Sequence, residues 1–94
     1  MERATLTAML DQAQGVQGSG DSYTIADGYR VSLYVGKPGQ GMEVTEVTKI
    51  GLKEGFCEVT AKEHNAAHYL EYSNLHGVTV RPPSGASTRR AGFS

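Results

Sequence analysis

An alternating pattern in residues 29–35 constrains the fold of this chain more than any other feature. Apolar side chains alternate there with Arg30, Ser32 and Tyr34, and the apolar ones are Tyr29, Val31, Leu33 and Val35. Successive side chains of a strand point to opposite faces, so the pattern predicts a strand with one buried face. It is the clearest strand in the sequence.

The glycine-rich segment that follows predicts a bend between two strands. A phosphate-binding loop would need a Ser or Thr directly after Lys37 and a helix beyond it. Pro38 follows Lys37 instead, and the next segment is rich in Val, Thr and Ile, which favour strands. Pro38-Gly39 suits the centre of a type II turn, where glycine supplies the positive φ.

Two more strands are expected in the middle of the chain. Residues 42–52 predict a long strand whose apolar residues change phase part-way along, which indicates a bulge or a sharp bend near Glu46. Residues 56–61 predict the next strand. We expect one core, formed by Leu6, Leu10, Tyr29, Val31, Leu33, Val35, Val44, Ile50, Leu52, Val59, Leu70 and Val80.

The chain divides into four parts by its pattern. Residues 1–15 predict a short helix, because Leu6, Met9, Leu10 and Ala13 form one apolar stripe. Residues 16–22 are glycine-rich and polar and predict a flexible linker. Residues 23–83 are expected to form a small β domain, and residues 84–94 a disordered tail.

Residues 60–76 have two interpretations. Thr60 and Glu63 make a capping-box pattern, which would begin a helix at about 61–76. The other interpretation places a turn at 64–66, a strand at 68–72, a single turn and a last strand at 78–81. The segment is rich in indifferent helix formers, so we favour the strands.

The fold class is then mainly β: a short N-terminal helix followed by a small, strongly bent, antiparallel five-stranded barrel. The alternative is an α+β fold, an antiparallel sheet with a helix at about 61–76.

Size and composition bound the class of protein. The chain has 94 residues, a net charge of −1 and one cysteine, Cys57. This length predicts one domain, and the charge speaks against a protein built mainly to coat nucleic acid. One cysteine cannot form an internal disulfide, so a reducing cytoplasmic location is expected. Neither a signal peptide nor an association with the membrane is predicted, because no apolar run is long enough.

Catalytic and metal-binding patterns are weak. His64 and His68 are four residues apart and Glu71 follows three later, so on a helix they would share a face and could hold a metal ion. The zinc-protease motif needs a glutamate where Asn65 stands. Cys57 lies among apolar residues with no activating base nearby. We therefore expect neither an enzyme nor a cofactor, and His64, His68 and Glu71 are only weak metal candidates.

Tyrosines on strands are the more suggestive residues. Such side chains can stack on single-stranded bases. Of the five tyrosines, Tyr34 is the best candidate for exposure, because it is out of phase with its apolar neighbours. Tyr34, Lys37 and Arg30 are therefore the candidate contacts to nucleic acid or to a protein partner.

The order of the expected elements, the string VSLY at 31–34 and the closing VTVRPP at 78–83 resemble the layout of the bacterial Sm-like (Hfq-type) RNA chaperones. The Tyr-Lys-His run of that family is replaced here by YLEYSNLHG, so no RNA-contacting residue carries over. The resemblance implies a small barrel that forms rings or dimers. We expect a non-enzymatic small β-barrel that acts as a binding or self-assembly module, with a second copy or another protein as its partner. The alternatives are Sm-like RNA binding and metal binding through His64 and His68.

Overall fold

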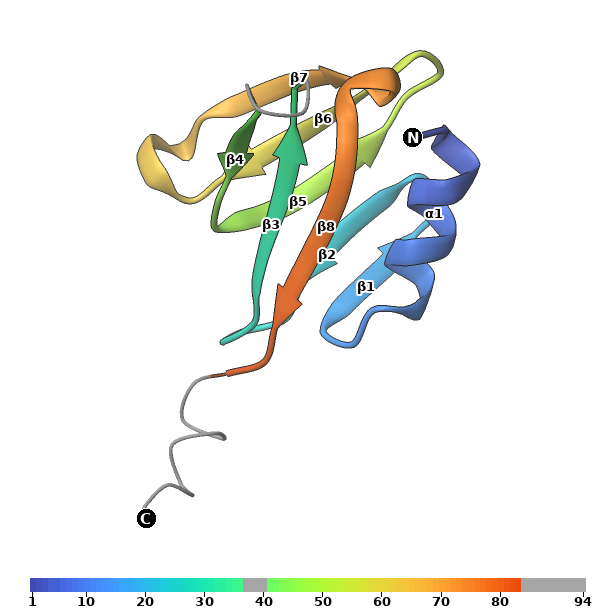
Figure 1. Ribbon diagram of the computed structural model, residues 1–94. Coiled ribbons are helices and arrows are strands. Elements are labelled where there is room, and N and C mark those ends of the chain that lie inside the picture. The colour runs from blue at the N-terminus through green and yellow to red at the C-terminus, as the bar shows by residue number, and fades with distance from the viewer. Residues whose placement is uncertain (37–40, 84–94) are drawn as a thin grey trace.

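The computed structural model describes residues 1–36 and 41–83, which form one helix and eight strands (Figure 1). The predicted turn at Pro38-Gly39, the candidate contact Lys37 and the predicted tail 84–94 lie outside these residues. The elements are α1 (Arg3–Gln12), β1 (Val16–Ser19), β2 (Ser22–Ile25), β3 (Arg30–Val35), β4 (Met42–Val44), β5 (Val47–Leu52), β6 (Phe56–Ala61), β7 (Ala67–Glu71) and β8 (Leu75–Arg81). Two one-turn 3-10 helices, η1 (Glu63–Asn65) and η2 (Tyr72–Asn74), precede β7 and β8. No helix in the described ranges is long and apolar enough to cross a membrane.

The strands form two antiparallel sheets. One has the order β1-β2-β5-β6-β7 and the other the order β4-β3-β8. The predicted class, mainly β with an N-terminal helix and antiparallel pairing, is confirmed. The sheets do not close into the predicted barrel, because β4 and β7, at the open ends of the two sheets, are not paired with each other. The open antiparallel sheet of the α+β alternative fits the structure in this respect.

The chain bends at Glu46, where it passes from one sheet to the other. β4 pairs with β3 in one sheet, and β5 pairs with β2 and β6 in the other. Glu46, between them, has a φ of 53°, in the left-handed region that few non-glycine residues adopt. Its carbonyl oxygen accepts a hydrogen bond of 2.9 Å from the backbone N–H of Lys62. The bend predicted near Glu46 is confirmed.

Residues 61–76 form turns and a strand, so the alternative helix is absent. His64 and Asn65 have φ values of 58° and 50° and make the turn between β6 and β7. β7 then pairs with β6 along five residues, from Phe56↔Glu71 to Thr60↔Ala67. The strand satisfies backbone groups against β6, whereas a helix here would lack a continuous apolar stripe to bury.

The structure differs from the prediction of a linker at residues 16–22. Residues 16–19 form β1, which pairs with β2 from Val16↔Ile25 to Ser19↔Ser22. The side chains of Gln17 to Ser19 are exposed, so no alternation of apolar residues marks this strand. Gly18 lies against the buried ring of Tyr23, and a Cβ there would be 2.8 Å from Tyr23 Cε2.

The core lies between the two sheets and under α1. Leu6 and Leu10 of α1 are fully buried, whereas Met9, on the predicted stripe, is exposed. Of the predicted core residues, Leu70 and Val80 are only partly buried and pack against the core, and Tyr29 is likewise half-buried. The other predicted members are buried. The prediction missed Tyr23, Val47, Cys57, Ala61, Tyr72 and Leu75.

Candidate functional site

The outer face of β3 and β8 carries two of the three candidate contact residues, Arg30 and Tyr34. Val31, Leu33 and Val35 point into the core, so the residues between them point outward. The register pairs Arg30 with Arg81, Ser32 with Thr79 and Tyr34 with Gly77. We call the surface formed by Arg30, Ser32, Tyr34, Thr79 and Arg81 the β3–β8 face. Within residues 1–36 and 41–83, no other helix or strand lies in front of β3 and β8 in Figure 1.

Arg30 and Arg81 stand directly opposite each other on this face. Residues paired in this way have Cβ atoms about 4.5–5.5 Å apart, and two like charges placed so destabilise a sheet. The ion pairs among the described residues join Arg3 to Asp21 and Glu63 to His64, so in this part of the chain no carboxylate lies within 4.0 Å of either arginine. The pair is a local concentration of positive charge on a chain whose net charge is −1.

Tyr34 occupies the other end of the face. Its hydroxyl oxygen accepts a hydrogen bond of 3.2 Å from Thr79 Oγ1. Its ring lies over Gly77, where a Cβ would be 3.7 Å from Tyr34 Cδ2. The side chain is 37% exposed. β8 therefore holds the ring in place from below and leaves part of it open to solvent.

A second surface lies where the two sheets fail to close. Hollows there are lined by Val35 and Met42 from one sheet and by His68, Tyr69 and Leu70 from the other; we call these five residues the β4–β7 seam. Met42 is 58% exposed and Tyr69 is 66% exposed. Phe56 lies beside the seam, with its ring edge-on to that of Tyr69 at a centroid distance of 6.3 Å.

The three metal candidates do not come together. His68 points inward from β7 and is half-buried, whereas Glu71 lies on the opposite, exposed face of the same strand. His64 lies in the turn before β7. In residues 1–36 and 41–83 no group of three or more His, Cys, Asp or Glu side chains could hold a metal ion. Residues spaced for one face of a helix are separated when the segment is a strand.

Cys57 lies in the core on β6 and is fully buried. Burial away from water raises the pKa of its thiol from 9.0 to about 11. A nucleophilic cysteine needs the opposite shift, because the thiolate is the reactive form. The environment of Cys57 is therefore that of a packing residue.

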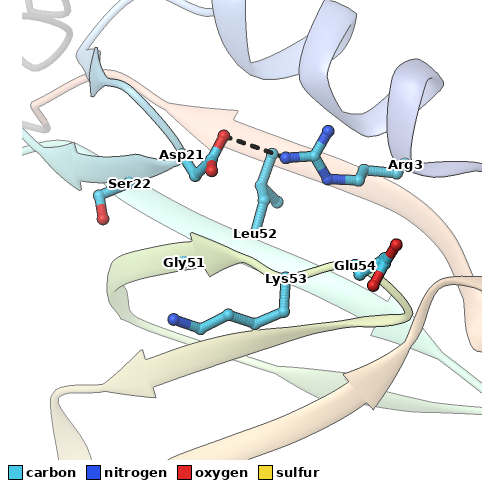
Figure 2. A pocket seen from close by; sticks show the side chains of 7 residues that line it. All are labelled: Arg3, Asp21, Ser22, Gly51, Leu52, Lys53 and Glu54. Atoms are coloured by element: carbon cyan, nitrogen blue, oxygen red, sulfur yellow. Dashed lines mark hydrogen bonds and ion pairs between the residues drawn. The ribbon is translucent and has the colours of Figure 1, made fainter.

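A third hollow lies between α1 and the ends of the β1–β2 and β5–β6 hairpins. Figure 2 shows Arg3 and Asp21 pointing toward each other across it, with their charged atoms 3.0 Å apart. Lys53 and Glu54 also line it, so its positive and negative charges balance. The ion pair connects α1 to the turn between β1 and β2, which is a structural role.

Comparisons of this chain with protein-family models, with the curated proteins and with the solved structures found no match. The candidate site is therefore identified from the positions and chemistry of this chain's own residues. Of the three predicted contact residues, the structure brings Arg30 and Tyr34 onto one face. Sequence reasoning missed Thr79 and Arg81, although their alternation with Val78 and Val80 is the signal that could have identified them.

Proposed function

We propose that this protein is a non-enzymatic binding module that assembles with copies of itself through the edge of β7. The observation that carries the proposal is the cluster of exposed apolar side chains at that edge. Five large apolar residues are exposed among the described ones, and Met42, Phe56 and Tyr69 lie at or beside the β4–β7 seam. Apolar side chains gathered beside an unpaired strand are typical of an interface.

The edge of β8 is the best partner for the edge of β7. Each of these strands ends its sheet, so no other strand in the described ranges pairs with its outer side. β7 has five residues and β8 has seven, enough for a continuous ladder between two copies. Glu71 of β7 and Glu58 of the neighbouring β6 lie on one outer face, and Arg81 at the end of β8 is paired with Arg30 of the neighbouring β3. Opposite charges therefore favour pairing of β7 in one copy with β8 in the next.

Pairing of two different edges has a geometric consequence. Each copy would keep one edge for a further copy, so the assembly would grow into a ring or a filament rather than stop at a symmetric dimer. A ring is also one of the assemblies that the Sm-like resemblance of the sequence implies.

Light scattering during size-exclusion chromatography at 1–100 μM (concentrations of the order at which weak interfaces form) tests the proposal. We expect species larger than the monomer, and we expect Tyr69→Lys to weaken the association at least tenfold. Met9→Lys is the matched control, because Met9 is also exposed, at 41%, but lies on α1. A protein that stays monomeric at the highest concentration, or equal effects of the two substitutions, would reject the edge of β7 as the interface.

A further inference from the structure

The facing arginines at one end of the β3–β8 face have a geometry that suits an anion. A guanidinium group presents its donors in a planar fork that matches the oxygens of a phosphate. Because Arg30 and Arg81 are directly paired across two strands, both side chains can reach one phosphate group. An anion between them would also remove the repulsion that the empty pair carries.

The rest of the face continues the site along the strands. The hydroxyls of Ser32 and Thr79 form the next outward pair, and Tyr34 follows. Tyr34 is four positions along the strand from Arg30, which is a distance of about 13 Å. An exposed aromatic ring on the same face as arginines is the combination that binds single strands, in which the ring stacks on a base and the cations contact the backbone.

Acidic groups limit the direction from which a polyanion can approach. Glu43 is paired with Tyr34 on the β4 side, and Asp27 and Glu46 share a hollow with Arg30 beside the end of β3. The outer surface of β8, in contrast, offers Thr79 and Arg81 and no carboxylate between them. The favourable path therefore follows β8.

From these observations we propose that the β3–β8 face binds single-stranded nucleic acid, with a phosphate between Arg30 and Arg81 and a base on the ring of Tyr34. Arg30 and Arg81 also lie at the end of β8 that the proposed assembly pairs with β7, but binding of nucleic acid by the monomer does not depend on that assembly. An acidic peptide would satisfy the arginines but would leave the tyrosine ring without a partner.

Fluorescence anisotropy with labelled 12-nucleotide oligouridylate and oligothymidylate tests the proposal. We expect Arg30→Gln and Arg81→Gln each to weaken binding several-fold in 20 mM salt. Tyr34→Ala should weaken it about 5- to 150-fold, the equivalent of about 1–3 kcal/mol for one stacked base. Tyr34→Phe keeps the ring and should bind like the unmodified protein.

The salt dependence provides a second, quantitative readout. Neutralising one phosphate on a single strand contributes about −0.7 to the slope of log K against log salt. One phosphate held between the two arginines predicts a slope of about −0.7, and either Arg→Gln variant should bring the slope closer to zero. A slope that stays unchanged in both variants would contradict the placement of the phosphate.

Three controls separate this site from its alternatives. Lys49→Gln removes one positive charge from the exposed surface of the other sheet and should leave binding unchanged. Tyr69→Lys disrupts the proposed assembly and should leave binding by the monomer unchanged. No saturable binding in 20 mM salt, an equal loss in Lys49→Gln, or competition by polyglutamate as strong as that by unlabelled oligonucleotide would each overturn the proposal. Melting curves of the arginine variants confirm that they are folded.

Discussion

Gly15→Ala is expected to destabilise the fold for two reasons that the structure separates. Gly15 follows α1 with a φ of +83°, and a Cβ at this position would lie 2.3 Å from Tyr29 Cδ2. A non-glycine residue in the left-handed region costs about 1–2 kcal/mol, and forcing an extra methyl group against a packed ring costs about 1–3 kcal/mol more. The free energy of unfolding should therefore fall by about 2–5 kcal/mol, a large part of the roughly 5–15 kcal/mol typical of a domain.

Gly20→Ala is the matched control for this substitution. Gly20 also has a positive φ, of +65°, but a Cβ there would meet nothing within 4 Å. The free energy of unfolding of Gly20→Ala should fall only by the cost of the left-handed backbone conformation, about 1–2 kcal/mol. Urea denaturation followed by circular dichroism measures both variants. The contact between Gly15 and the Tyr29 ring does not restrict this position if Gly15→Ala and Gly20→Ala lower the free energy of unfolding equally. The same conclusion follows if adding Tyr29→Ala to Gly15→Ala fails to restore part of the lost stability.

Three further substitutions test other contacts. Arg81→Gln should raise the free energy of unfolding by about 0.2–1 kcal/mol in low salt, because it relieves a like-charge pair; a gain that persists in 1 M salt would contradict this cause. The free energy of unfolding should fall between about pH 9 and pH 11, by up to about 1.4 kcal/mol per pH unit. The cause is the raised pKa of Cys57, which keeps its thiol protonated in the folded state while the unfolded chain ionises; urea titrations should show a flatter pH profile for Cys57→Ala. Tyr72→Phe removes the 2.6 Å hydrogen bond from the Tyr72 hydroxyl to the carbonyl oxygen of Lys53 and should cost about 0.5–1.5 kcal/mol in the same assay.

The strands that could be predicted are those in which apolar and polar residues alternate, because this alternation identifies the buried face. β3 alternates strictly, and the change of phase near Glu46 marks the bend. β1 could not be found in this way, because its exposed side chains carry no pattern and its place depends on backbone pairing with β2. Closure of a barrel could not be predicted either, since it depends on how far β4 and β7 lie apart.

The candidate site was predictable to the same limited extent. Alternation along β3 is enough to put Arg30 and Tyr34 on one outer face. The partnership with Arg81 depends on the register between two strands that are distant in sequence, and register is determined by packing of the whole sheet. The metal candidates failed because the spacing of His64 and His68 has chemical meaning only on a helix.

The pairing of β3 with β8 also has a consequence during synthesis of the chain. About 40 residues separate Val35 from its partner Leu75. At about 5–20 residues per second, the ribosome needs about 2–8 s to make them. During this interval β3 lacks the strand that pairs with one of its edges. An unpaired strand with Val31, Leu33 and Val35 on one face can pair with a wrong partner. Nascent chains stalled with β3 outside the ribosome and β8 still inside it should therefore be captured by chaperones, and chains extended far enough for β8 to emerge should be released from them.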